Sequence, residues 1–354
     1  MRTIFESKVP SMKVTIKKIA EIAGVHPATV DKVLHNRPGV SDEVRERVQK
    51  LIDELGYKPN PAGRVLQQQG KEFIIAAILV KVDALPYIRD GIEKGIREQT
   101  GLDIKIHWYL TSYSDAGQQA QYIDKAVEEK ADGIIISPIT SNRVREAINR
   151  ASDAGIPVIA ANSDIEGTRR LCYVGQDGLR ASRVAGRTMG NFLRGRGRIA
   201  IISSAIDNEN NSYHVKVRED GFRGFLRETF PEIEIVASVE SYEDPEITYR
   251  ETYNLLKKYP DLDGLYITCG GVGQVGRAIR DCGREDIKTL SFEKYPEILD
   301  LMQEDIIDCT IDSELERQGE IPVQIIMDQL VLKKAPPEQN IYTDIRILIK
   351  ECLF

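Results

Sequence analysis

The residues best suited to chemistry near the N-terminus lie on one face of a helix predicted to begin at Pro27. Proline is favoured at the first helical position because its missing N–H would have no intrahelical partner there. Val30 and Val33 fall on the inner face of this helix, so the polar side chains around them point outward. Hydroxyl, amide, imidazole and ammonium groups on an exposed helix can hydrogen-bond to base edges in the major groove of DNA. The candidate DNA contacts on this helix and its flanks are His26, Pro27, Ala28, Thr29, Asp31, Lys32, His35 and Asn36.

Two further helices are needed to hold this face in place. Apolar residues at helical spacing predict a first helix from Ile16 to Ala23, with Thr15 as its N-cap and Gly24 as the left-handed residue that ends it. A third helix is predicted from Asp42 to about Leu55, capped by Ser41. A helix, a three-residue turn and a second helix form the helix-turn-helix arrangement of DNA-binding proteins. The rival interpretation is an ordinary three-helix subdomain that binds no nucleic acid.

A hinge bounded by prolines follows the third helix. Pro59 and Pro61 flank Asn60, at the point where the helical pattern stops. The sequence therefore predicts a DNA-binding domain at residues 12–59, a hinge at 60–70 and a core at 71–354.

From Val14 to about Gln68 the chain resembles the lactose-repressor (LacI/GalR) family of bacterial transcription regulators. The resemblance rests on the patterns T-I-x-x-I-A-x-x-A-G-V, then T-V, then V-S-x-x-x-R-x-x-V, then L-G-Y-x-P-N. It implies that a short hinge helix inserts Leu66 as a wedge into the minor groove, which costs a few kcal/mol of base unstacking. Thr15 and Arg64 are implied as further DNA contacts.

Two features of this segment depart from the family pattern. Asp31 and Lys32 follow T-V, where a serine and an arginine or histidine are usual, and Gly63 lies in the hinge where alanine is usual. Asp31 is unfavourable near phosphates unless it accepts from a cytosine amine or pairs with Lys32. Gly63 is expected to weaken the free hinge helix by about 1 kcal/mol.

Charge and composition limit the remaining possibilities. Residues 1–70 contain 12 basic and 8 acidic residues, whereas the whole 354-residue chain has a net charge of −7, so a basic head precedes an acidic body.

No run approaches the ~18 to 20 apolar residues of a membrane span, and residues 1–11 lack an apolar signal core, so a cytoplasmic location is expected. Five scattered cysteines without a C-x-x-C pair, and four scattered histidines, predict reduced core thiols and no metal site.

The rest of the chain alternates strand patterns with helical patterns, which predicts an α/β fold of parallel sheets flanked by helices. The first series has strands at 73–80, 103–109, 133–137 and 157–161, and helices at 88–100, 118–130 and 142–154. The second has strands at 199–203, 233–239, 264–268 and 288–292, and helices at 215–229, 247–259, 273–282 and 295–303. Two similar series predict two similar lobes, and residues 340–350 are predicted as a final strand.

The core resembles the sugar-binding core shared by this repressor family and the periplasmic ribose-type binding proteins. The motifs are Asp132-Gly-Ile-Ile-Ile-Ser-Pro138, Ala154-Gly-Ile-Pro-Val-Ile-Ala-Ala-Asn-Ser-Asp164 and Tyr173-Val-Gly-Gln-Asp177. The resemblance implies a small sugar or polyol bound between the lobes, beyond the carboxyl ends of the strands. The residues that match the family's sugar-binding positions are Asn162, Arg218, Thr268, Glu293 and Ser313.

Three of these positions depart from the family pattern. Thr268 and Cys269 replace the usual N-D, Glu293 replaces an aspartate, and Ser313 replaces a glutamine. An aromatic wall against a sugar ring could come from Tyr87, Trp108, Tyr109, Tyr113 or Tyr213, although Trp108 is expected in the core.

A glycine motif supports a rival function. Gly271-Val-Gly273-Gln-Val-Gly276 matches the G-x-G-x-x-G dinucleotide fingerprint, follows a predicted strand and opens a predicted helix, with Glu293 ending the next strand. It favours an NAD-dependent oxidoreductase or an NAD-sensing regulator, but it lies late in the second lobe instead of at a first strand. A solute-binding protein for transport is a third possibility, which the basic head disfavours.

Together these patterns predict a cytoplasmic, ligand-responsive transcription regulator, a repressor by resemblance. It would bind as a homodimer to a pseudo-palindromic double-stranded DNA operator, because two-fold symmetry in the protein matches two half-sites in the DNA. No catalytic residues, no metal, no cofactor and no membrane partner are expected, and no P-loop, G-x-S-x-G or H-E-x-x-H motif occurs in the chain.

Overall fold

The computed structural model of the chain describes residues 14–34, 37–55, 57, 61–204, 213–242 and 244–353. The chain forms two compact units, Met1–Arg64 and Val65–Phe354, and each is described by itself. The boundary lies inside the predicted hinge segment. Two of the predicted DNA contacts, His35 and Asn36, lie outside the described residues.

The first unit contains the three predicted helices, α1 (Ile16–Ala23), α2 (Pro27–Leu34) and α3 (Asp42–Glu54). Thr15 caps α1 as expected, since its hydroxyl accepts from the backbone N–H of Lys18 at 3.3 Å. Gly24 ends α1 with φ of 65°, the left-handed conformation that glycine adopts at little cost. Ser41 stands at the N-cap of α3, but its side chain makes no capping hydrogen bond, so that part of the prediction is wrong.

A small apolar core joins the three helices. Ile19, Val30 and Val48, one from each helix, are completely buried in it. Burying one such side chain from each helix contributes about 1.5 to 3 kcal/mol apiece. A fourth helix, α4 (Pro61–Gln67), begins at the predicted hinge, and proline again occupies its first position.

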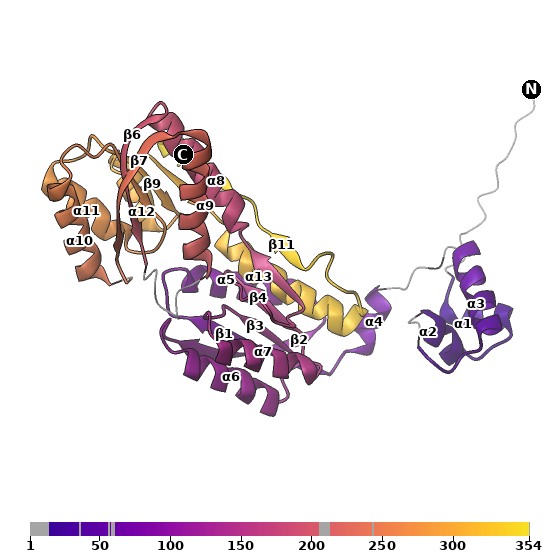
Figure 1. Cartoon of the computed structure of the whole chain (residues 1–354). Helices are drawn as coiled ribbons and strands as arrows, with labels where there is room; N and C mark the ends of the chain where they lie inside the picture. The colour runs from indigo at the N-terminus through magenta and orange to yellow at the C-terminus, as the bar shows by residue number, and fades with distance from the viewer. Residues whose placement is uncertain are drawn as a thin grey trace, which may run out of the picture. The chain divides into compact units, whose positions relative to one another are not determined.

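The second unit has two α/β lobes, as Figure 1 shows. The strands of lobe 1 are β1 (Glu72–Val80), β2 (Asp103–Thr111), β3 (Gly133–Ile136), β4 (Val158–Ala161), β5 (Cys172–Gly175) and β11 (Asn340–Tyr342). Its helices are α5 (Leu85–Glu98), α6 (Ala116–Glu128), α7 (Asn142–Asp153) and α13 (Leu315–Met327), which runs into a short π-helix at Asp328–Leu332. The sheet order is β11-β5-β4-β3-β1-β2, and all its pairs are parallel.

Lobe 2 repeats this plan. Its strands are β6 (Arg196–Ser203), β7 (Glu232–Glu240), β8 (Gly264–Ile267), β9 (Lys288–Phe292), β10 (Cys309–Asp312) and β12 (Arg346–Leu348). Its helices are α8 (Gly178–Phe192), α9 (Tyr213–Thr229), α10 (Pro245–Lys258), α11 (Val272–Cys282) and α12 (Pro296–Gln303), with a last 3-10 turn at Lys350–Cys352. The sheet order is β12-β10-β9-β8-β6-β7, in which only the β10–β12 pair is antiparallel. The predicted two-lobed parallel architecture is therefore confirmed.

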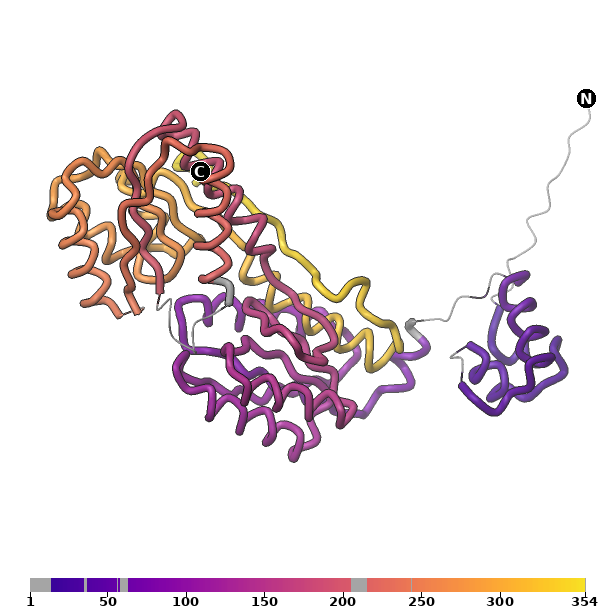
Figure 2. The backbone as a smooth tube through the Cα atoms, in the orientation of Figure 1, coloured from indigo at the N-terminus to yellow at the C-terminus, as the bar shows by residue number. Residues whose placement is uncertain are grey.

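Within its described residues the chain crosses between the lobes three times, as can be followed along the tube in Figure 2. The crossovers lie between β5 and α8, between β10 and α13, and between β11 and β12. The third one corrects the prediction of a single strand at residues 340–350. That segment is two short strands, one in each sheet, separated by Thr343-Asp344-Ile345.

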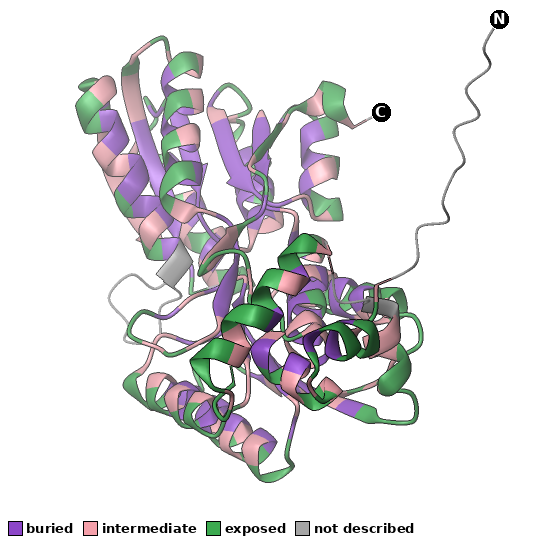
Figure 3. Cartoon of the chain, turned by 90° about the vertical axis from the view of Figure 1, so that its right-hand side faces the viewer, coloured by how far each residue is buried: buried purple, intermediate pink, exposed green. Residues whose placement is uncertain are grey.

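Helices cover both sheets, so the central strands are buried on both faces (Figure 3). In lobe 1, α5 and α13 approach so closely that a Cβ on Gly91 would lie 2.0 Å from the carbonyl oxygen of Glu316. A Cβ on Gly319 would lie 2.1 Å from the carbonyl oxygen of Ile88. Backbone atoms cannot move aside as a flexible side chain can, so this crossing requires glycine on both helices.

The described helices include none with the length and apolar character needed to cross a membrane.

Candidate functional site

The outer face of α2 carries the predicted DNA contacts that the structure describes. His26, Ala28 and Lys32 are exposed, while Pro27, Thr29 and Asp31 are half-buried. The ring of His26 has a local role, because its Nδ1 accepts from the backbone N–H of Ala28 at 3.2 Å. One imidazole nitrogen therefore forms a hydrogen bond at the start of α2.

Asp31 pairs with a basic residue that the sequence had not singled out. Its carboxylate forms an ion pair with Arg37 at 3.2 Å. An exposed pair adds little stability, but it neutralises a carboxylate that would otherwise repel DNA phosphates. Lys32 remains on the exposed face of the helix.

The predicted wedge, Leu66, lies on α4 and is 63% exposed. Its neighbour Val65 packs instead against the apolar core of lobe 1. Leu66 is therefore available to contact a partner, whereas Val65 is partly buried.

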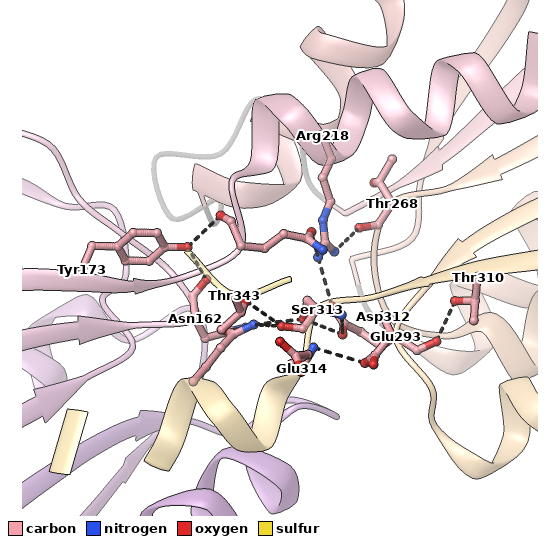
Figure 4. A network of polar contacts seen from close by, with 12 residues as sticks. Asn162, Tyr173, Arg218, Thr268, Glu293, Thr310, Asp312, Ser313, Glu314 and Thr343 are labelled. Carbon is pink, nitrogen blue, oxygen red and sulfur yellow. Dashed lines mark hydrogen bonds and ion pairs between the residues drawn. The ribbon is translucent and has the colours of Figure 1, made fainter. Parts of the chain in front are cut away.

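In the second unit, the five predicted ligand-binding residues belong to one polar network at the ends of the strands (Figure 4). Arg218 extends from α9 into its centre and is only 6% exposed. One terminal nitrogen donates to the carbonyl oxygen of Thr268 at 3.1 Å, and the other donates to Glu293 at 3.0 Å. The guanidinium lies over the ring of Phe292, 3.7 Å from its centroid, so both its plane and its charge are held in place.

Glu293 follows β9 and is the buried counterpart of Arg218. Its second carboxylate oxygen accepts from the Ser313 hydroxyl at 2.7 Å and from the Ser313 backbone N–H at 3.4 Å. Burial raises the pKa of the Glu293 carboxyl, while Arg218 and Ser313 act in the opposite direction. Thr310 donates to the backbone carbonyl of Glu293 at 2.6 Å, which fixes the turn after the strand.

Asn162 joins the network from lobe 1. Its amide donates to Gln318 at 3.2 Å, and Gln318, on α13, donates to the carbonyl and the hydroxyl of Ser313 at 2.7 and 3.0 Å. Thr343, in the third crossover, donates to the same Ser313 carbonyl at 2.7 Å. The network therefore contacts the second and third crossovers as well as both lobes.

Three residues of this region have a left-handed backbone that is unusual outside glycine. Asn162, Glu293 and Glu314 have φ of 67°, 73° and 56°. Asparagine tolerates this conformation, but glutamate does so at a cost of order 1 to 3 kcal/mol. Such strain persists where the surrounding contacts impose it, and it is frequent at binding sites.

Gln176, on the first crossover, belongs to the same network and was not among the predicted ligand residues. Its side-chain oxygen accepts from Arg218 at 3.3 Å, and the residue is only 8% exposed. Within the described part of the chain, the Nε2 of Gln176 and the Nε of Arg218 are buried donors without an acceptor. The only available signal was its place in the Tyr173–Asp177 motif, where it precedes the N-cap of α8.

Thr268 contributes to the site differently from the expectation. Its hydroxyl is turned into lobe 2, where it contacts the carbonyl of Ile202 at 3.3 Å and the hydroxyl of Ser203 at 3.1 Å. Only its backbone carbonyl meets Arg218. Of the two residues that replace the usual N-D, Cys269 lies beside the Ser241 hydroxyl at 3.4 Å.

The aromatic candidates separate into two groups. Tyr87 pairs with Tyr295, with ring centroids 5.3 Å apart, beside a cavity of about 600 Å³ that lies between the loops after β1 and β9. Tyr113 donates to the carbonyl of Tyr242 at 3.1 Å, a contact between the lobes. Tyr109 bonds to Glu129 and Trp108 packs beside the lobe 1 core under Arg89, so these two do not reach the network. The side chain of Tyr213 lies outside the described residues.

Neighbouring side chains pack against the glycines of the G-x-G-x-x-G motif. A Cβ on Gly276 would lie 2.5 Å from Leu301, and a Cβ on Gly273 would lie 3.0 Å from the carboxylate of Glu297. Glu297 accepts a hydrogen bond from the Gly273 backbone, at the start of α11 where a pyrophosphate would have to bind. A carboxylate in that position repels phosphate, so the dinucleotide interpretation is not favoured.

The described residues include no group of three or more potential ligands that could hold a metal ion. The cysteines carry free thiols, and Cys172, Cys269 and Cys309 are buried. The expectation of core thiols fails for Cys352, which is exposed, and for Cys282, which is half-buried.

Two protein-family models match the chain. The model described as Periplasmic binding protein domain matches residues 75–334, and the model described as Bacterial regulatory proteins, lacI family, matches residues 15–60. Both matches agree with the two units of the structure.

The chain is also similar to individual proteins. The HTH-type transcriptional regulator TreR of Salmonella typhimurium is 27% identical over 169 residues, which cover 46% of this chain and 49% of that protein. The HTH-type transcriptional regulator GntR of Pseudomonas aeruginosa is 25% identical over 292 residues, 80% of each chain. The first curated relatives that the chain matches are covered over only about half to three-fifths of their length, from 49% to 60%.

Among solved structures, the second unit is similar to a solute-binding protein of an ABC transporter from Burkholderia graminis, determined in complex with D-arabinose. The TM-score is 0.73 at 22% identity, over 79% of this chain and 96% of that one. This similarity concerns the fold.

Proposed function

Because this chain belongs to the periplasmic binding protein domain family and carries a lacI-type head, we propose that it is a transcription regulator whose DNA affinity a small ligand controls. The head would bind a specific operator, and a small sugar or polyol would bind between the two lobes. The observation that carries the proposal is the pairing of a helix-turn-helix with a polar network that contacts both lobes and all three crossovers.

The chemistry of the network suits a polyhydroxylated ligand. Arg218 and Asn162 provide planar groups with more than one donor, which can bind neighbouring hydroxyls of a sugar ring. The structural relative that contains D-arabinose has the same two-lobed fold. A ligand lacking the matching hydroxyls would leave buried polar groups unpaired, so it would be rejected.

The mechanism would be a change in the relative population of two lobe arrangements. The strands leading into the crossovers end at Gly175, Asp312 and Tyr342, and residues just beyond each of them contact the network. A ligand that binds one arrangement more tightly shifts the equilibrium toward it. Such coupling usually amounts to about 1 to 3 kcal/mol, which would change operator affinity by roughly 5- to 150-fold.

The assembly would be a cytoplasmic homodimer on a pseudo-palindromic operator. Two heads related by a two-fold axis would place two α2 helices in successive major grooves, and Leu66 of each α4 would enter the minor groove. In that arrangement the regulator acts as a repressor, with the ligand setting the spacing of the two hinges.

Selection from randomised double-stranded DNA with the full chain tests the DNA-binding part of this proposal. The expected result is enrichment of an inverted repeat with two half-sites. A variant with both Lys32→Ala and Leu66→Ala serves as the matched control and should enrich nothing. Equal enrichment by the chain and the control, or none by either, would contradict the assignment.

A further inference from the structure

The charges of the polar network are already balanced within the protein. Arg218 faces Glu293 at 3.0 Å, and the side chains of both are 8% exposed. The next cation, Lys294, faces Asp312 at 3.4 Å and Glu316 at 3.8 Å. Among the described residues, these two cations therefore each have a carboxylate partner, and the buried Arg218–Glu293 pair leaves no excess positive charge for a ligand.

This balance of charges discriminates against negatively charged ligands. A phosphate or carboxylate group entering the network would bring a negative charge into a buried region where Glu293 already neutralises Arg218. Burying a charge without a partner is costly, whereas a hydroxyl needs only hydrogen bonds. Lys81, the nearest cation on the rim of the Tyr87 cavity, is exposed, so solvent weakens its attraction for an anion.

The network also leaves two donors for a neutral acceptor. Arg218 uses both terminal nitrogens within the protein, but its Nε has no acceptor among the described residues. Gln176 uses its oxygen, but its Nε2 has none either. Both residues are more than nine-tenths buried, and unpaired buried donors are rare in folded proteins. An oxygen of a ligand would satisfy each of them.

We propose that the effector is an uncharged molecule whose oxygen atoms accept hydrogen bonds from Arg218 Nε and Gln176 Nε2. This inference rests on the proposed ligand site between the lobes, and it adds both the charge of the ligand and a binding residue on the first crossover. Because Gln176 connects the ligand to that crossover, it provides a direct route from occupancy to the relative position of the lobes.

The exclusion of anions can be tested with inorganic phosphate. Melting temperatures of the full chain are measured without DNA at pH 8, in phosphate and in chloride at equal ionic strength. Wild type and the Arg218→Gln variant should respond to phosphate equally, through the head alone. The Glu293→Gln variant should gain an additional increase of roughly 2 to 4 °C, because Arg218 then lacks a carboxylate. The double variant Arg218→Gln/Glu293→Gln should lose that gain.

Two results of this experiment would overturn the inference. One is a phosphate response in wild type that disappears in Arg218→Gln, which would show that the intact pair binds anions. The other is a well-folded Glu293→Gln variant with no additional response, since Glu293 would then not be what excludes them.

Calorimetric titration of wild type with matched sugars provides a test without mutation. The series are D-glucose with D-glucose 6-phosphate and D-gluconate, and D-arabinose with D-arabinose 5-phosphate and D-arabinonate. In a series that binds, the neutral member should bind at least about tenfold more tightly than its charged forms, and the opposite order would overturn the inference.

Gln176→Glu tests the second donor, because it keeps an oxygen for Arg218 and replaces the Nε2 donor with a negatively charged oxygen that cannot donate. It should weaken the neutral ligand about tenfold or more, and an unchanged affinity would remove Gln176 from the site. None of these measurements involves DNA. A chain that binds a neutral ligand but selects no operator would contradict the proposed regulator and leave this inference intact.

Discussion

At the scale of single residues, the site is a buried ion pair surrounded by amides and hydroxyls. Arg218 and Glu293 form an ion pair, and the guanidinium lies over the ring of Phe292. Ser313 donates to the second oxygen of Glu293, and the side-chain oxygen of Gln176 accepts from Arg218. Five residues from separate strand ends and helices were expected to meet, and the structure brings all five into one network. The departures from the family pattern are accommodated locally, since Glu293 and Ser313 bond to each other.

The Glu293 carboxyl should make stability depend on pH in a definite direction. Burial raises its folded-state pKa above the ordinary value of 4.5. A raised pKa means that the folded state binds this proton more tightly than the unfolded chain does, so this contribution to stability is complete below pH 4.5 and is lost as pH rises through the folded pKa. Melting temperatures between pH 4 and pH 8 should therefore fall for wild type relative to Glu293→Gln. A constant difference would show that the carboxyl is not perturbed.

In the head, Lys32 should determine which sequence is bound. It lies on the exposed face of α2, whereas the neighbouring Asp31 is paired with Arg37. Lys32→Ala should cost about 1 to 3 kcal/mol on the preferred half-site and change the sequence selected from random DNA. Lys50→Ala on α3, which removes a charge paired with Glu54, is the matched control and should leave the preference unchanged. An equal loss on all sequences would make Lys32 a phosphate contact.

At the scale of elements, most strands and helices follow from sequence periodicity, but two strands (β5 and β10), two helices (α8 and α13) and the division of the tail do not. α13 contains Pro322, which normally ends a helix, and α8 contains three glycines, so neither has a typical helical pattern. The tail was predicted as one strand because its apolar residues continue through residues 340–350. Its interruption comes from tertiary contacts, where Thr343 bonds to Ser313 between the two sheets.

The hinge helix α4 should limit the affinity for DNA. Gly63 lies in its first turn, and alanine would favour the helix by about 1 kcal/mol. Gly63→Ala should tighten operator binding roughly fivefold in fluorescence anisotropy, and Leu66→Ala should weaken it by at least about tenfold. If neither variant changes the affinity, α4 does not enter the DNA.

The close crossing of α5 and α13 should be intolerant of any side chain. Gly91→Ala places its Cβ 2.0 Å from a backbone oxygen, so the two helices must separate. Overpacking of this kind should destabilise the chain by about 3 kcal/mol in urea unfolding. The control is Gly224→Ala on α9, where a Cβ would meet nothing within 4 Å and should change stability by no more than about 1 kcal/mol. Equal effects of the two variants would contradict the close packing.

At the scale of the whole molecule, the chain combines a unit suited to reading DNA with a unit suited to binding a small ligand. Sequence patterns were sufficient to predict both units, because caps, turns and strand–helix alternation are local signals. They were not sufficient to find Gln176, because its role depends on the fold bringing the first crossover beside α9. The crossovers are the part of the molecule that can convert ligand occupancy into a change of lobe position, and residues at all three of them contact the network.

The most direct test of this account measures operator affinity with and without ligand. The full chain is titrated against a duplex obtained by selection from random DNA, in the presence of each member of a panel of neutral pentoses, hexoses and inositols. One member should change the Kd of wild type by roughly 5- to 150-fold, and should have no effect on Arg218→Gln, which should still bind the duplex. An effect of the same size in both proteins, or loss of DNA binding by Arg218→Gln alone, would contradict the placement of the ligand at Arg218.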